Sequence, residues 1–143
     1  MLRFCDDTLC IDQRRTGVKP RMIADYECDC GEGPLWHPGE KLLYWLDIPR
    51  GRIFRYDPAT GKHEQYFEGA PMGGISFQAD GGLLLFGEQG SVKLLRDGAL
   101  KTIIEDIPEE RETRFNDVCT DPMGRVFCGT MPAKGEQSGR LYL

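Results

Sequence analysis

The sequence predicts an all-β fold, part of a β-propeller, and three observations support this prediction. Residues 36–45 recur as 77–86 and again as 120–129, each time as a short strand, a turn rich in small and polar residues, and an apolar strand. Repeats of about 40–45 residues with several strands each are typical of propeller blades. Glycine makes up 18 of the 143 residues, well above the usual share of about 7%, as frequent tight turns require. No segment carries the apolar period of a helix over three turns.

The first residues stand outside the repeat. Residues 1–20 show no repeat signal, and we predict an unstructured leader there. From Arg21 to Glu27 the side chains alternate as in a strand. A strand placed before the first blade often completes the last blade of a propeller and so hides two sheet edges. We expect this strand to find no such blade within this sequence.

Each repeat continues with further strands, and four strands make one blade. We predict a first blade at about 31–68 and a second at about 72–105, with third strands at 52–56 and 91–95 and fourth strands at 63–67 and 100–104. The third repeat, at about 114–143, stops within its third strand at 140–143. Because propellers close a ring of four to eight blades, we predict a truncated ring of about three blades.

Composition argues against two classes of partner. The net charge is −5, whereas a nucleic-acid surface needs clustered Lys and Arg. No apolar run approaches the length of a membrane span, and the N-terminus has no apolar signal region. We therefore expect a cytoplasmic protein without nucleic-acid or membrane partners.

The six cysteines do not have the spacing of a known metal or redox motif. Cys28 and Cys30 form a C-x-C pair rather than the C-x-x-C of a zinc ribbon, and Cys5 and Cys10 lie in the leader. Two further cysteines, Cys119 and Cys128, fall where the first blade has Leu35 and Tyr44, so we predict that both are small core residues. Reduced cysteines without a ligand are favoured over a metal site or disulfides.

Three positions begin the innermost strand of their blades, and the repeat makes them equivalent: Glu32, Gly73 and Asn116. We expect Glu32 and Asn116 to converge on one concave mouth. The carboxylate of Glu32, set between glycines, suits a hard cation or acid–base chemistry. A solvated turn glutamate fits the same residues equally well.

The third mouth position lies in the run Arg114-Phe115-Asn116-Asp117. Residues two apart on a strand face the same side, so Arg114 and Asn116 could reach one ligand while Phe115 packs between blades. Arg and Asn together suit hydroxyl and carboxylate oxygens. An ion pair from Arg114 to Asp117 or Glu112 is the alternative that the spacing leaves open.

Taken together, five motifs resemble the senescence-marker-protein, gluconolactonase and regucalcin family. They are Gly-Glu-Gly-Pro-x-Trp at 31–36, Leu-Tyr-Trp-x-Asp-Ile at 43–48, Gly-Gly-Ile-Ser-Phe at 73–77, Arg-Phe-Asn-Asp at 114–117 and Asp-Pro-x-Gly-Arg-x-Phe-x-Gly-Thr-Met at 121–131. The resemblance runs from about Arg21 to Leu143. It implies a six-bladed propeller that holds one divalent metal in its channel and hydrolyses sugar-acid lactones.

The same resemblance implies roles for individual residues. Glu32 would be the first metal ligand, and Arg114 and Asn116 would contact substrate. The metal could be Ca, Zn, Mn or Mg. An Asn and an Asp in later blades would complete the metal site, and that Asp would be the general base. Some relatives place a substrate-binding Glu where this sequence has Lys134, with Glu136 close enough to replace it.

Three function classes follow from these expectations. The first is a metal-dependent lactonase acting on a sugar lactone, and the second is a non-catalytic calcium-binding or small-molecule-binding propeller. The third is an inactive truncated fragment. Open blade faces would also expose apolar surface and sheet edges, so we expect the chain to dimerise or aggregate.

Overall fold

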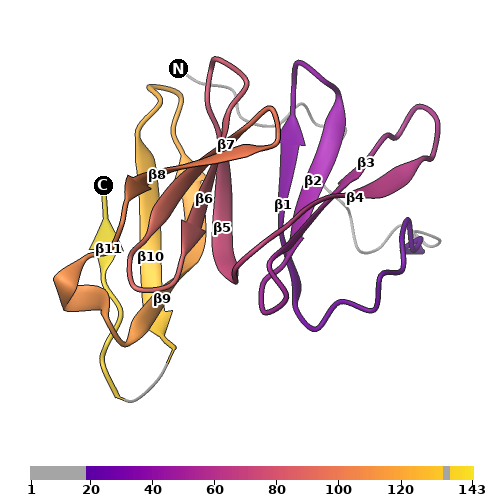
Figure 1. Cartoon of the computed structure of the whole chain (residues 1–143). Coiled ribbons are helices and arrows are strands. Elements are labelled where there is room, and N and C mark those ends of the chain that lie inside the picture. Colours follow the sequence, from indigo (N-terminus) through magenta and orange to yellow (C-terminus); the bar gives the residue numbers. More distant parts are fainter. Residues whose placement is uncertain (1–18, 134–135) are drawn as a thin grey trace, which may run out of the picture.

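The computed structural model describes residues 19–133 and 136–143, which form three antiparallel sheets in sequence order (Figure 1). The first sheet contains β1 (Gly31–His37), β2 (Leu42–Asp47), β3 (Arg52–Tyr56) and β4 (His63–Glu68). The second contains β5 (Met72–Phe77), β6 (Leu83–Gly87), β7 (Val92–Arg96) and β8 (Ala99–Ile104). A short 3-10 helix, η1 (Pro108–Glu110), precedes the third sheet of β9 (Thr113–Thr120), β10 (Val126–Pro132) and β11 (Leu141–Tyr142). Each sheet is an antiparallel meander, so the prediction of an all-β fold built from propeller blades is confirmed.

Two apolar layers hold the three sheets together. Between the first and second sheets, Tyr44, Leu46 and Ile53 pack with residues such as Ile75 and Leu85. Between the second and third sheets the layer is formed by Phe86, Val92, Phe115 and Cys128. The alternation of strand side chains between two faces lets the middle sheet contribute to both layers.

The first strands of the three sheets lie next to one another. Strand β5 contacts β1 on one side and β9 on the other. The ends of these three strands therefore share one region of the molecule, as the repeat predicts for the innermost strands of neighbouring blades.

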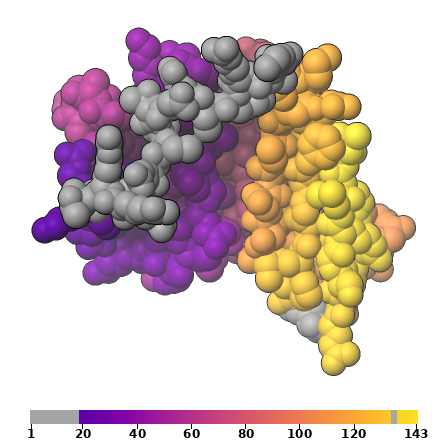
Figure 2. Space-filling view, turned by 180° about the vertical axis from the view of Figure 1, so that it is seen from behind, coloured from indigo at the N-terminus to yellow at the C-terminus, as the bar shows by residue number. Residues whose placement is uncertain are grey.

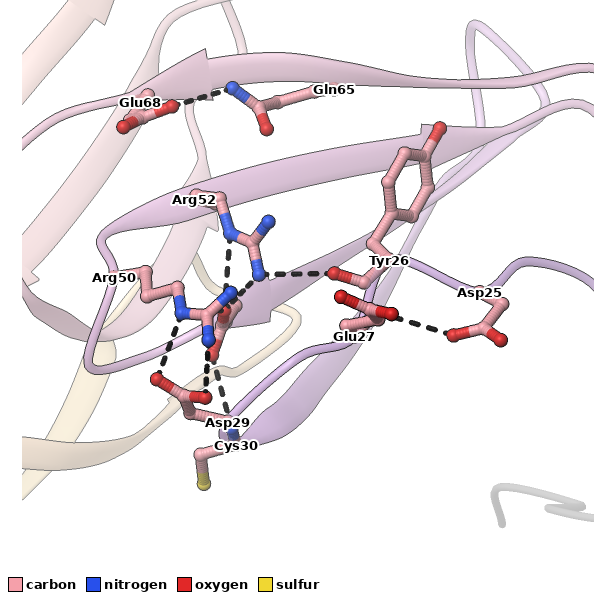
Figure 3. Close-up of polar contacts among 10 residues, drawn as sticks. Asp25, Tyr26, Glu27, Asp29, Cys30, Arg50, Arg52, Gln65 and Glu68 are labelled. Atoms are coloured by element: carbon pink, nitrogen blue, oxygen red, sulfur yellow. Dashed lines mark hydrogen bonds and ion pairs between the residues drawn. The ribbon is translucent and has the colours of Figure 1, made fainter.

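The segment before the first sheet differs from the prediction. Residues 19–30 contain no strand, so the strand predicted for Arg21–Glu27 is wrong, because this backbone pairs with no strand of the described residues. The segment packs on the first sheet through side chains instead. The Tyr26 ring stacks on Phe54 with 4.3 Å between centroids, and Arg52 Nη2 donates to the Tyr26 carbonyl at 3.2 Å (Figure 3). Apart from residues 19 and 20, the predicted leader lies outside the described residues.

The prediction for the two repeat cysteines is half right. Cys128 is buried between the second and third sheets, as expected. Cys119 is exposed, because it pairs with Phe127 in the register of β9 and β10 and so lies on the opposite face from Cys128. No described sheet covers that face. Four cysteines lie in the described residues, all as free thiols, and Cys5 and Cys10 lie outside them.

No helix in the described part of the chain is long and apolar enough to cross a membrane. The cytoplasmic location stays a prediction.

Candidate functional site

A cavity of about 470 Å³ opens where the first strands of the three sheets meet. Its walls are backbone and side chains of β1, β5 and β9, and they include all three mouth positions, Glu32, Gly73 and Asn116. The volume falls within the range of about 300–1,000 Å³ that small-molecule sites occupy. Glu32 and Asn116 therefore line one concave site, although 84 residues separate them in the sequence.

Two carboxylates face this cavity rather than one. Asp117 also lines it, and its Oδ1 accepts a hydrogen bond from the Val118 backbone amide at 2.9 Å. A larger hollow of about 560 Å³ lies beside β3 and the turn after it. That hollow draws on the first sheet alone, whereas the cavity at Glu32 collects equivalent positions from three repeats, and we take the latter as the candidate site.

A β-bulge interrupts each of the three strands at the cavity. The register shifts between Glu32 and Leu35 on β1, between Met72 and Gly74 on β5, and at Asn116 on β9, which no residue of β10 faces. Bulges twist a strand locally and redirect its side chains, and they are common beside active sites. The sequence motif reveals the mouth positions, but it does not reveal these bulges.

Glycine allows β5 and β9 to approach backbone to backbone. A Cβ atom on Gly73 would overlap the carbonyl oxygen of Phe115, and one on Gly74 would overlap the Val118 side chain. The cavity wall between the second and third sheets is therefore mostly main chain. This close approach explains why the mouth position on β5 is a glycine, whereas those on β1 and β9 carry polar side chains.

The start of β1, which carries Glu32, is fixed by a buried carboxylate. Asp47 at the end of β2 is fully buried, and its Oδ1 accepts the Cys30 amide at 3.0 Å while Oδ2 accepts Arg52 Nη2 at 2.5 Å. Burial alone would raise the pKa of Asp47, but the hydrogen bonds from Arg52 and the Cys30 amide hold that pKa below its ordinary value. The charged carboxylate of Asp47 thus holds the backbone at Cys30, two residues before Glu32.

The residues around Asp47 form a wider polar cluster (Figure 3). Arg50 binds Asp29 through two hydrogen bonds, of 2.9 and 2.7 Å. Burial raises the pKa of the Cys30 thiol, and the neighbouring Glu32 carboxylate raises it further. Cys30 therefore stays a neutral thiol next to the cavity.

Arg114 is linked to the cavity by a hydrogen bond to Asn116, which lines it. Its Nη1 donates to the Phe115 carbonyl at 2.8 Å and to Asn116 Oδ1 at 3.3 Å, so the predicted pair does meet. Arg114 is not itself part of the cavity wall. Among the ion pairs of the described residues, none joins Arg114 to Asp117 or Glu112. Phe115 is buried, with its ring edge-on to Phe86 at 5.3 Å, which confirms its predicted place between blades.

The described residues do not form a complete metal site. No three His, Cys, Asp or Glu side chains among residues 19–133 and 136–143 are grouped so that they could hold a metal ion. Calcium takes six to eight oxygen ligands and zinc about four ligands. Glu32 fits the role of one carboxylate ligand, and further ligands would have to come from outside this set.

The resemblance implies a substrate-binding position at Lys134, or at Glu136 in its place. Lys134 lies outside the described residues. Glu136 is exposed and is not part of the cavity wall.

Comparison with known proteins agrees with this geometry. The family model described as "SMP-30/Gluconolactonase/LRE-like region" matches residues 30–143. Pentonolactonase XacC of Haloferax volcanii is 48% identical over 120 residues, which cover 84% of this chain and 40% of that protein. A 6-deoxy-6-sulfogluconolactonase of Pseudomonas putida is 33% identical over 114 residues, 79% of this chain and 39% of the relative.

A solved structure has the same arrangement of sheets. The calcium-binding protein regucalcin of Agrobacterium tumefaciens superposes with a TM-score of 0.72 at 22% identity, over 84% of this chain and 41% of that one. The chain thus spans about 40% of the length of these relatives. Because the family model covers nearly all of the described residues, the chain belongs to the SMP-30/gluconolactonase/LRE-like family.

Proposed function

We propose that this chain supplies one side of the substrate site in an enzyme that hydrolyses sugar-acid lactones, with one divalent metal ion bound at Glu32. The observation that carries the proposal is the convergence of Glu32 and Asn116 in one cavity. Two of the relatives are named pentonolactonase and 6-deoxy-6-sulfogluconolactonase. Both names describe hydrolysis of a cyclic sugar ester, and the family is shared.

The residues in the cavity suit a sugar lactone. Asn116 offers an amide donor and an acceptor, and the Arg114 guanidinium is bound to its oxygen, so together they can orient ring hydroxyls and the ester oxygen. Glu32 adds a carboxylate to the same cavity from β1. The metal, when bound, would polarise the ester carbonyl.

A non-catalytic role is the second candidate. The superposed regucalcin is described as a calcium-binding protein, and Glu32 fits calcium binding as well as catalysis. Turnover separates the two candidates, because a binding protein would take up Ca²⁺ at Glu32 without hydrolysing a lactone.

The decisive experiment uses a chimera in which this chain replaces the matching 40% of pentonolactonase XacC. Hydrolysis of gluconolactone and of a pentonolactone is measured with and without a chelator. We expect chelator-sensitive turnover that Glu32→Gln removes almost completely, whereas Arg114→Ala mainly raises KM, because orienting contacts bind the substrate and the transition state more evenly. A chimera that folds and binds Ca²⁺ without turnover would support the second candidate instead.

The 143-residue chain alone gives the matching control. Because the described residues hold no complete metal site, we expect hydrolysis near the uncatalysed rate. Rapid, chelator-sensitive hydrolysis by this chain would contradict the assignment, and Asp117 and Glu136 would then be the first residues to substitute.

A further inference from the structure

A second buried carboxylate lies just before β9, the strand that carries Asn116. Glu110 is fully buried at the end of η1. Its carboxylate accepts hydrogen bonds from Thr113 Oγ1, from Arg140 Nη1 at 2.8 Å and from Tyr142 OH at 2.5 Å. Burial acts to raise the pKa of Glu110, but these donors outweigh it and hold the pKa at about 2. The carboxylate is therefore charged, and its partners come from both edges of the third sheet.

These contacts clamp the beginning of β9. Thr113 is buried and is the first residue of that strand. Its carbonyl accepts the Gln89 amide at 2.9 Å, and the next residue, Arg114, forms a β-bridge with Glu88. The strand thus starts between Glu110 on one side and the second sheet on the other. Arg114 is the next residue after Thr113, and Asn116 is three residues after Thr113.

The placement of buried carboxylates follows the site rather than the repeat. Among the described residues, the fully buried acidic side chains are Asp47 and Glu110. Asp47 binds the backbone just before Glu32, and Glu110 binds the first residue of the strand that carries Asn116. The remaining mouth position, Gly73, has no side chain to orient.

We infer that Glu110 is a positioning residue for the sugar site: its carboxylate fixes the start of β9 against β11 and so holds Arg114 and Asn116 in place to bind an aldonate or its lactone. The inference rests on the proposed function. A buried carboxylate held by three donors is rigid, and a shift of about 1 Å in orienting groups can cost a large factor in binding or rate.

The test uses the chimera described above, in which this chain replaces the matching 40% of pentonolactonase XacC, with sodium gluconate as the probe. The chimera without further substitution serves as the wild type. Gluconate is titrated while the side-chain NMR signals of Arg114 Nε and Asn116 Nδ2 are followed. We expect Glu110→Gln to weaken gluconate binding about tenfold or more, and Glu110→Asp, which keeps the charge, to recover part of it. The milder Tyr142→Phe, which removes one donor, should weaken binding about two- to fivefold.

Glu109→Gln is the matched control, because Glu109 is exposed and takes part in this cluster only through its carbonyl. It should bind gluconate as the wild type does. Backbone spectra of the first two sheets establish that each variant is folded. If Glu110→Gln does not fold, the gluconate affinity of Tyr142→Phe tests the inference.

Two outcomes would overturn the inference, and they differ. If the wild-type signals respond to gluconate and both Glu110→Gln and Tyr142→Phe respond equally, Glu110 does not position the site, while the proposed function stands. If the wild-type signals of Arg114 and Asn116 do not respond at millimolar gluconate, the sugar site itself is wrong and the inference falls with it.

Discussion

At the scale of single residues, the site depends on a glycine as much as on its polar side chains. Gly73 permits the second and third sheets to meet at the cavity, because any Cβ there would overlap the Phe115 carbonyl. Sequence comparison between repeats identified this position but gave no reason for the glycine. The reason lies in the contact of Gly73 with Phe115 on the next blade, which a pattern within one repeat does not contain.

Replacing this glycine gives a direct test. We expect Gly73→Ala to destabilise the fold by about 2 kcal/mol or more, because β5 and β9 must separate to admit the methyl group. Gly129→Ala is the control, since a Cβ at Gly129 meets nothing within 4 Å. It should change the free energy of unfolding by less than about 1 kcal/mol. Urea unfolding of both variants checks this, and equal effects would contradict the close approach of the strands.

The same scale shows what the sequence could predict. Glu32 and Asn116 occupy equivalent repeat positions, and a repeated fold brings such positions together, so their shared cavity followed from spacing. Asp47 and Glu110 were missed, because an acidic residue in a sequence gives no sign of burial. The one available signal was the Asp of the motif at 43–48, which stands at the end of an otherwise apolar strand.

At the scale of elements, the strands of the three sheets lie where the repeat predicts them. The β-bulges and the segment before the first sheet were not predicted correctly. Turn residues mark where strands stop, which is why the strands of the first two sheets were predictable. The bulges at the cavity arise from pairing between strands and from the twist of each sheet. Residues 21–27, within the segment 19–30, alternate like a strand, but they pair with no strand of the described residues. Alternation alone therefore gave a wrong prediction.

That segment is attached to the first sheet through Arg52, and its attachment can be tested. Arg52→Ala should destabilise the protein by about 3–5 kcal/mol, because it leaves the buried charge of Asp47 without its main partner. It should also release Tyr26, whose carbonyl Arg52 binds. Chemical denaturation measures the first effect, and protease cleavage within 19–30 measures the second.

Arg50→Ala is the matched control for this prediction. Arg50 and Asp29 are both nearly half exposed, and exposed pairs contribute about 1 kcal/mol or less. Arg50 also lies 4.0 Å from Asp47, but no hydrogen bond joins the two, so Asp47 keeps Arg52 when Arg50 is removed. A loss for Arg50→Ala as large as that for Arg52→Ala would show that the buried pair has no special role.

At the scale of the whole molecule, no other sheet of the described residues covers the outer face of the third sheet. Cys119, Phe127 and Leu141 lie on the face away from the second sheet, and Leu141 is 75% exposed. Figure 2 shows the third sheet, in orange and yellow, at the opposite end of the molecule from the first sheet, in indigo. At the first sheet, Trp36 is 48% exposed. Exposed apolar surface of this kind favours association.

We therefore expect the 143-residue chain to dimerise or aggregate, and two copies could pair as three sheets plus three. Light scattering after size exclusion measures the mass, and Leu141→Lys should shift the population toward monomer, because it places a charge on this outer face. Met123→Lys is the control, since Met123 is 80% exposed in a turn outside that face. A monodisperse wild-type monomer with cooperative melting would contradict the prediction.

The glycine contact between β5 and β9 also bears on how the family could diversify. A cavity wall made of main chain presents the same peptide groups in every homologue. Mutation can therefore change this part of the cavity very little. Differences in substrate choice between a pentonolactonase and a sulfogluconolactonase would then have to arise where side chains, rather than main chain, line the cavity. In this chain the side chains of Leu35, Asp117 and Val118 line the cavity beside Glu32 and Asn116. Substitutions at these positions, rather than at Gly73 or Gly74, are the ones that should change which lactone the chimera prefers.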